Sequence, residues 1–382
     1  MAGLSVSPLL QQQRTNFNLY ACTALESNNF YLRFDAARAL AMVGNPVGLD
    51  VLKEALTVGD NRQQLQAIKV SSFLPEIAAL QVLSLALNGS PELRIPAIQK
   101  LGEIKGDSAQ SLLLKLYSQN LPSSEFREVS FALGANGGRS AVEALSKSFV
   151  ALTGSKIDKS VLSKIAVLSF SLLQLKEEHY LYLKEVLSPL LNNQSPFIVL
   201  GVASVLAKGN NEMIEIIEAL LTSDPYLEFD ASELLKHIKT KAAETLLGIV
   251  NKSIGIEPVE EKLFTDEQII KMLTGNSTED KIRAANILVE LIRKGKPIDS
   301  RMIKELKQMA ETGSESWSEP ACHSANAARR AAFRALSELG EWDFLEGKIT
   351  ALNKAHTQLA LFAMARLLHN EEAEFISSDI LQ

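Results

Sequence analysis

The chain has 382 residues, of which 46% are hydrophobic and 6% aromatic, and its formal net charge is −6. This acidic balance argues against non-specific nucleic-acid binding, which depends on a basic excess. Two cysteines, Cys22 and Cys322, are too few for a disulfide framework and fit a reducing compartment. The N-terminus lacks the features of a secretory signal, and the most apolar stretch, 161–175, is too short and too polar to span a bilayer. We therefore expect a soluble cytoplasmic protein.

A sequence motif recurs along the chain after an irregular N-terminal lead-in over residues 1–14. Its first copy, YLRFDAARALAMVGNPVGLDVLKEAL, covers residues 31–56, and degraded copies cover 92–116, 125–149 and 328–352. Each copy contains two helical stretches, and uninterrupted copies follow one another at about 30 residues. Such a repeat predicts an all-α solenoid, in which each unit buries its apolar face only against its neighbours.

One leucine in each unit closes the apolar stripe of the second helix, and we call it the anchor. In the first unit Ala36, Ala37, Leu40 and Val43 lie on one helical face, and Leu40 is the anchor. Ser71 takes the anchor position in a divergent copy over 63–87, and a further copy fits around 161–175. The anchors are Leu40, Leu101, Leu133, Leu206, Leu235, Leu288, Leu336 and Leu367, which gives nine or ten units.

Glycine and proline mark where the helices of this repeat end and begin. Glycines near the anchors are expected to end helices; they are Gly44, Gly102, Gly106, Gly134, Gly137 and Gly340. A cap residue followed by proline is expected to begin a second helix. This pair occurs at Ser90-Pro91, Ser195-Pro196 and Asp224-Pro225.

Helical periodicity lapses over residues 251–264, where Gly255 and Pro258 lie. We therefore divide the repeats into an N-terminal block, 15–255, and a C-terminal block, 256–370. Thr265 and Gln268 have the spacing of a capping box, which would begin a helix of the second block. A loop insertion is expected over 311–325, and an acidic tail over 371–382.

The repeat resembles HEAT-like repeats, in particular the short subtype of phycobilisome lyases and of many bacterial scaffold proteins. The resemblance rests on R-x-x-A-A-x-A-L-x-x-x-G at 33–44, R-x-x-A-I-x-K-L-G at 94–102 and R-x-x-A-F-R-A-L at 329–336. It covers nearly the whole chain, from about residue 15 to 370, and implies a right-handed α-solenoid whose second helices line a concave groove. It leaves the function open, because many unrelated activities share this scaffold.

Two sets of side chains recur with the repeat. Basic residues seven positions before the anchor are expected to bond turn carbonyls or an acid of the next unit; an array of ligand-binding cations is the alternative. They are Arg33, Arg94, Lys281 and Arg329.

The resemblance implies that residues five and two positions before the anchor, the second-helix stripe, face the groove. These are Asp35, Arg38, Gln66, Lys69, Gln99, Glu128, Phe131, Gly201, Ser204, Asp230, Glu233, Arg283, Asn286, Arg334 and Phe362.

Partner-binding candidates come from this stripe and from the 311–325 loop. Each stripe residue has an ordinary solvated face as its alternative, and Phe131 and Phe362 could instead be buried by neighbouring repeats. Trp317 in the loop is either a binding anchor or part of a disordered segment. The candidates are Asp35, Arg38, Lys69, Glu128, Phe131, Asp230, Glu233, Arg283, Asn286, Arg334 and Trp317.

No catalytic or metal-binding pattern stands out in the sequence. The five histidines form no H-E-x-x-H, Cys322-His323 lacks the further ligands of a zinc site, and phosphate-binding loops are missing. We therefore expect a non-enzymatic scaffold that binds a protein partner in its groove and needs neither cofactor nor metal. The alternative, which the resemblance alone implies, is a bilin lyase or lyase-like chaperone of phycobiliproteins. A HEAT-like DNA glycosylase is a third reading, and the mixed charges of the stripe oppose it.

Overall fold

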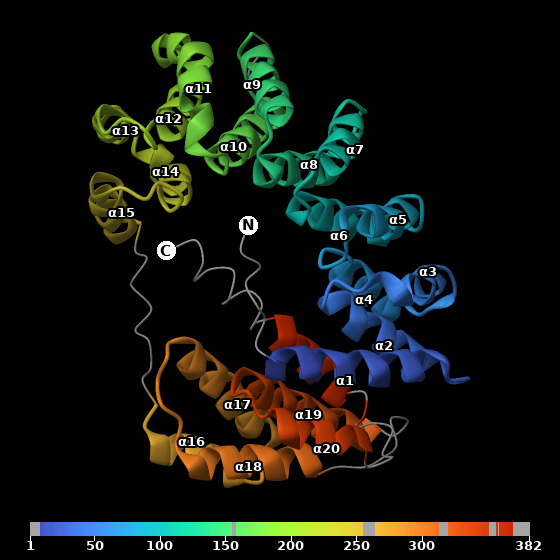
Figure 1. Ribbon diagram of the computed structural model, residues 1–382. Coiled ribbons are helices and arrows are strands. Elements are labelled where there is room, and N and C mark those ends of the chain that lie inside the picture. Colours follow the sequence, from blue (N-terminus) through green and yellow to red (C-terminus); the bar gives the residue numbers. More distant parts are fainter. Residues whose placement is uncertain are drawn as a thin grey trace. The chain divides into compact units, whose positions relative to one another are not determined.

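The computed structural model describes residues 8–154, 158–254, 264–312, 320–350, 357 and 359–369. The regular structure in these ranges is helical, and no strand occurs in them (Figure 1). None of the helices in the described part of the chain is both long and apolar enough to cross a membrane. The all-α fold predicted from the repeat is confirmed.

The helices form two compact units, which are described separately. Unit 1 combines residues 1–78 with residues 261–382, and unit 2 contains residues 79–260. The lapse of helical periodicity over 251–264 predicts a single division, near residue 255. The division at residue 78 falls inside α5 (Glu76–Leu87), and a continuous helix carries no glycine, proline or lapse of periodicity that could mark it.

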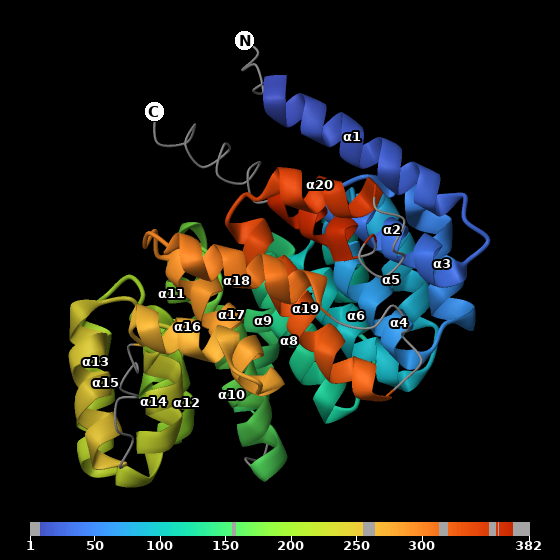
Figure 2. The ribbon, with the colours of Figure 1, turned by 90° about the horizontal axis from the view of Figure 1, so that it is seen from below.

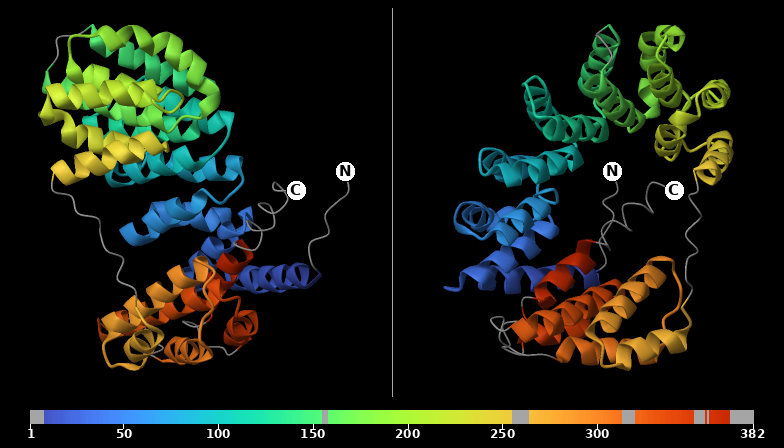
Figure 3. Two further views of the ribbon diagram at one scale, coloured as in Figure 1. Left: turned by 90° about the vertical axis from the view of Figure 1, so that its left-hand side faces the viewer. Right: turned by 180° about the vertical axis from the view of Figure 1, so that it is seen from behind.

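Unit 2 is a stack of helix pairs. Its second helices pack against one another in succession, and Figures 1 and 3 show them along the inner side of the curve of this unit. The first helices are α5, α7 (Asp107–Tyr117), α9 (Arg139–Thr153), α11 (Tyr180–Leu187), α13 (Glu212–Ser223) and α15 (Lys241–Ser253). The second helices are α6 (Pro91–Glu103), α8 (Ser123–Asn136), α10 (Lys159–Leu173), α12 (Pro196–Leu206) and α14 (Glu228–Leu235). Short 3-10 turns are η2 (Glu177–His179), η3 (Ser188–Asn192) and η4 (Pro225–Leu227).

Unit 1 contains the repeats from both ends of the chain. Its first helices are α1 (Pro8–Leu25), α3 (Leu49–Val58), α16 (Asp266–Thr274), α18 (Ser300–Glu311) and α20 (Trp342–Thr350). Its second helices are α2 (Phe30–Met42), α4 (Asn61–Ser71), α17 (Thr278–Arg293), α19 (Pro320–Glu338) and a segment over 359–369 that we call the last helix. The 3-10 turn η1 (Pro46–Gly48) joins α2 to α3.

Two expected irregular segments are partly helical. Helix α1 begins at Pro8, inside the expected lead-in over 1–14, because proline fits a first turn and the following Leu and Gln residues favour helix. The expected loop over 311–325 is shorter, since α18 includes Glu311 and α19 begins at Pro320. Trp317 and the tail over 371–382 lie outside the described residues.

The anchors form the core, as the repeat predicts. Every anchor leucine is 3% exposed or less, and Ser71 in the divergent copy is completely buried. The hydroxyl of Ser71 donates a hydrogen bond of 2.7 Å to the carbonyl of Ile68, which satisfies its polar group within the helix. The anchor positions predicted from the repeat are therefore confirmed as buried positions.

Some glycines of the repeat end helices, and others let successive second helices approach closely. Gly44, Gly137 and Gly340 have positive φ and follow α2, α8 and α19, as expected. The same prediction is wrong for Gly102 and Gly134, which lie inside helices. A Cβ on Gly102 of α6 would lie 2.8 Å from Ala132 Cα in α8, and one on Gly134 of α8 would lie 2.3 Å from the Ser171 carbonyl oxygen in α10.

The predicted helix starts are confirmed. Pro91 and Pro196 are the first residues of α6 and α12, and Pro225 begins the turn η4 that leads into α14. Thr265 accepts from the backbone of Gln268, whose side chain accepts in return, so the capping box forms at the start of α16.

The recurring arginine ties a second helix to the turn before it and to the next unit. Arg94 donates through Nη1 to the Leu87 carbonyl at 2.8 Å. Its Nε and Nη2 donate to the two oxygens of Glu125 in α8, at 3.1 and 2.9 Å. This bidentate geometry combines charge with directional hydrogen bonds.

In two further repeats the arginine also binds the turn before its helix, and in one of them it pairs with an acid as well. Arg329, which is fully buried, donates through Nε and Nη2 to the Thr312 carbonyl at 3.1 and 2.9 Å. Arg33 donates to the Ser27 carbonyl at 3.2 Å and pairs with Glu54 at 3.3 Å. The structural interpretation of this position is therefore confirmed for the three arginines.

The anchor leucines predict where a charge unfolds the solenoid. Leu101→Asp places a carboxylate at a position with 0% exposure and should lower the free energy of unfolding by about 3 kcal/mol or more. Leu181→Asp, at a position with 78% exposure in the same unit, should change it by about 0.5 kcal/mol or less. Urea denaturation followed by circular dichroism compares the two variants, and equal losses would show that the repeat phase is wrong.

The repeat arginine should contribute more to stability than an exposed ion pair. Arg94→Met removes the bond to the turn and leaves the largely covered Glu125 without its cation, at an expected cost of about 2 kcal/mol. Arg139→Met removes an exposed pair with Glu143 and should cost about 0.5 kcal/mol or less. Similar midpoints in urea for the two variants would contradict this role.

Candidate partner-binding surface

The second-helix stripe falls into separate groups in the two units. In unit 2, Glu128 of α8 is only 8% exposed. It accepts a hydrogen bond of 2.9 Å from Gln99 of α6 and pairs with Arg127 at 2.9 Å. Glu128 therefore links two successive second helices, and little of its carboxylate faces solvent.

A row of aromatic rings crosses the second helices of unit 2. Phe131 of α8 meets Phe170 of α10 edge to face, with ring centroids 6.4 Å apart. Phe170 in turn meets His237, which follows α14, at 5.4 Å. Both phenylalanines are half-buried and His237 is exposed. Between them α12 contributes only the small, buried Gly201 and Ser204 to the stripe.

Phe131 is among the candidates predicted from the sequence, whereas Phe170 and His237 are not. Phe170 lies two positions before Leu172, which is 1% exposed and occupies the anchor position of the copy around 161–175. The sequence alone assigns that copy no anchor. We call Phe131, Phe170 and His237 the aromatic row.

Acidic side chains lie beside the aromatic row on α14. Asp230 and Glu233 are half-buried, and desolvation raises the pKa of Asp230 above its ordinary value. Glu233 forms an ion pair with Lys236. Tyr226 of η4 and Phe229 of α14, at 94% and 63% exposure, precede these acids in the chain. We call the aromatic row with these four residues the unit 2 surface.

In unit 1, the stripe residues of the first repeat contact the end of the chain. Asp35 and Arg38 of α2 form an ion pair of 2.7 Å. The Arg38 guanidinium carbon lies 4.6 Å from the ring centroid of Phe362, a stripe residue of the last helix, and 5.5 Å from that of Phe34. Arg38 therefore stacks on rings from both ends of the sequence.

Further contacts join the two ends of the chain within unit 1. Helix α20 lies beside α1 (Figure 2). Glu346 of α20 accepts hydrogen bonds from Asn16 at 2.9 Å and from Tyr20 at 3.2 Å, both in α1. The ring of Phe73 meets that of His369 edge to face at 5.0 Å. Lys69, the remaining candidate of this region, is exposed on α4.

The three remaining stripe candidates of unit 1 line one open hollow. Arg283 and Asn286 of α17 and Arg334 of α19 are exposed and border a space of about 680 Å³. Ile282, Ile287, Glu279 and Glu290 of α17 complete the lining. The guanidinium of Arg283 lies 5.1 Å from the centroid of the Phe264 ring, on which it stacks. Three residues of the second-helix stripe therefore line the same hollow, although they come from two helices.

The charges that act on Arg334 include a cluster around Glu338 of α19. Arg293 of α17 and Arg366 of the last helix bind this buried carboxylate at 2.9 and 2.6 Å. Burial opposes ionisation of Glu338, but the two arginines hold its pKa below the ordinary value. The pKa of Arg334 is lowered, first by desolvation and then by the charges of Arg366 and Arg293.

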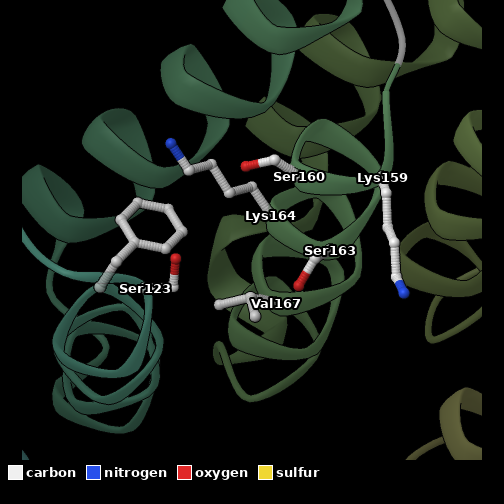
Figure 4. Close-up of a pocket in the computed structure, with 7 residues that line it drawn as sticks. Ser123, Lys159, Ser160, Ser163, Lys164 and Val167 are labelled. Carbon is white, nitrogen blue, oxygen red and sulfur yellow. The ribbon is translucent and has the colours of Figure 1, made fainter.

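A smaller hollow of about 350 Å³ lies between α8 and α10 in unit 2 (Figure 4). Lys164 extends over the ring of Phe126, with its nitrogen 5.5 Å from the ring centroid, and Ser160 lies beside it. Lys159, which also borders the space, points away from Lys164. The polar side chains do not converge on one point, so we assign this hollow no ligand. No group of three or more His, Cys, Asp and Glu within the described ranges could hold a metal ion.

Comparison with known proteins identifies the repeat. Residues 32–57, which form most of α2 and α3, match the model of the PBS lyase HEAT-like repeat. Comparison with curated proteins gives no match. Among solved structures, the complex of CpcE and CpcF of phycocyanin lyase from Nostoc sp. PCC7120 aligns with 15% identity and a TM-score of 0.22, over 95% of this chain and 96% of that chain. The family match identifies one HEAT-like repeat, at residues 32–57.

The stacking of Arg38 predicts an energetic coupling between the two ends of the sequence. In a double-mutant cycle, Arg38→Met and Phe362→Leu should show a coupling of about 0.5–2 kcal/mol in the free energy of unfolding. Phe344→Leu is the control partner, because the Phe344 ring contacts Lys307 and Lys348 instead. Additive effects of Arg38→Met and Phe362→Leu would contradict the contact.

Proposed function

We propose that this protein is a lyase-like chaperone of phycobiliproteins, which binds its client protein through the second helices. The observation that carries this proposal is the PBS lyase HEAT-like repeat at residues 32–57, in a chain that repeats the same helix pair. This reading was the alternative in the sequence analysis, and the family match supports it more than it supports a scaffold without bilin chemistry.

The unit 2 surface is the proposed docking site for the client. Its aromatic row and the exposed rings of Tyr226 and Phe229 offer the kind of side chain that dominates binding energy at protein interfaces. Asp230 and Glu233 add negative charge beside the rings, which favours a client patch that carries lysine or arginine. The proposed surface therefore has an aromatic centre with an acidic margin.

The test of this proposal is co-expression with an apo-phycobiliprotein subunit and a bilin. The subunit should co-purify with this protein, and its visible absorbance from covalently bound bilin should exceed that of a culture without this protein. Co-purification without a gain in bound bilin would favour the general scaffold. Neither co-purification nor a gain would overturn both readings.

Charge reversal on α14 tests the docking surface. The double variant Asp230→Lys/Glu233→Lys should weaken binding of the subunit by about tenfold, because it reverses the charge that a basic client patch faces. Stability should change little, since the Glu233 pair is partly exposed. Isothermal titration calorimetry measures the affinity, and thermal melting checks the fold.

The matched control is Glu215→Lys/Glu218→Lys on α13. These residues have the same three-residue spacing and the same total charge change, and both are exposed on a first helix. This control should bind the subunit as tightly as the unmodified protein. If the two double variants lose affinity equally, long-range charge explains the effect and the docking site is not on α14.

A further inference from the structure

Three arginines and one aspartate from three second helices of unit 1 form a cluster of charges. Asp35 and Arg38 lie on α2, Arg62 lies on α4, and Arg330 lies on α19. Asp35 and Arg38 form an ion pair of 2.7 Å. The charge of Arg62 acts on both members of this pair, and it also acts on Arg330. The cluster therefore combines residues from both ends of the sequence within electrostatic reach of one another.

The cluster has an excess of positive charge. Its three guanidinium groups and one carboxylate leave two positive charges once Asp35 and Arg38 have neutralised each other. Among the described residues, neither the Arg62 nor the Arg330 side chain makes a hydrogen bond or an ion pair. Arg62 is exposed and Arg330 is half-buried, so the two excess charges are carried by side chains that a ligand can reach.

Arg330 differs from the neighbouring arginine on its helix in the charges that act on it. Desolvation and the charge of Arg62 lower the pKa of Arg330, and no acid of the described residues offsets these effects. The pKa of Arg334 is also lowered, but Glu338 and Glu290 oppose that change. The folded protein therefore holds the Arg330 charge at an energetic cost.

The repeat does not require an arginine at position 330. Six positions before the anchor, the other charged residue is Arg127, which pairs with Glu128 at 2.9 Å. The remaining units have an apolar residue there: Phe34, Leu65, Ile95, Ala166, Leu200, Phe229, Ile282 and Leu361. A departure from the repeat that places an uncompensated charge on a binding face is typical of a functional position.

We propose that Arg62 and Arg330 bind a phosphate group, as a free ion or as a phosphate monoester. Such a group carries nearly two negative charges at neutral pH, which match the excess charge of the cluster. Its oxygens accept the paired N–H donors of a guanidinium group. Arg38 keeps Asp35 paired and so limits the repulsion between this carboxylate and the ligand. The site belongs to unit 1 and goes beyond the client binding proposed for unit 2.

Titration of the full chain with inorganic phosphate at constant ionic strength tests this site. Isothermal titration calorimetry should show saturable binding, and Arg62→Met and Arg330→Met should each weaken it by about tenfold, the effect of one charged hydrogen bond. Arg301→Met on α18 is the matched control, because it removes an exposed arginine of unit 1 outside the cluster. This control should leave the affinity unchanged. Equal weakening by all three variants, or unchanged affinity in both cluster variants, would overturn the proposal.

Thermal melting without phosphate separates a binding role of Arg330 from a structural one. Arg330→Met should raise the melting temperature, because it keeps the apolar stem and removes a charge that the folded protein disfavours. Phosphate should raise the melting temperature of the unmodified protein more than that of Arg330→Met. A lower melting temperature of Arg330→Met in phosphate-free buffer would show that the fold needs this arginine and would overturn its assignment to a ligand.

A second probe identifies the source of the phosphate group. A phosphoserine peptide carries the same group as inorganic phosphate, and its unphosphorylated form measures the contribution of the peptide alone. Binding of the phosphopeptide at least tenfold more tightly than both would support the site with a phosphorylated protein as its ligand. Equal or tighter binding of inorganic phosphate would support the site with a small phosphate as its ligand. Absence of saturable binding of both phosphate probes would overturn the site.

Discussion

The structure depends on one constraint, which is that no repeat has a core of its own. Within each unit, second helices pack against neighbouring second helices and bury their anchor leucines, and in unit 2 Gly102 and Gly134 bring successive second helices into backbone contact. Arg94 shows how the orientation is fixed, since it binds the preceding turn and the following helix at once. Because these contacts bury one face of each second helix, the opposite face stays exposed and can bind a partner.

The same constraint explains why unit 1 is built from both ends of the sequence. A solenoid end exposes an apolar face unless a capping element covers it. In unit 1 the last helix contacts α2 through Phe362 and Arg38, and α20 contacts α1 through Glu346. The first and last repeats thus cover part of each other, which gives a physical reason for a compact unit that is discontinuous in sequence.

The repeat predicted the anchors, the helix starts and the structural role of Arg33, Arg94 and Arg329, because these depend on local spacing. It did not predict the roles of Gly102 and Gly134, since a glycine that ends a helix and one that admits a neighbour look alike in sequence. The stripe rule selected Arg283, Asn286 and Arg334, which line one hollow, but it could not show that Glu128 is covered or that Arg38 stacks on Phe362. Those outcomes depend on contacts between residues far apart in the chain.

We expect the client to bind the exposed face of the second helices, whose opposite face forms the stack, and to leave the first helices uncovered. Hydrogen–deuterium exchange of the protein with and without an apo-phycobiliprotein subunit tests this division most directly, because it reads each helix separately. Amides of the second helices α8, α10 and α14 should exchange more slowly in the complex, while those of α7, α9 and α13 should exchange at unchanged rates. Protection confined to the first helices would contradict the account.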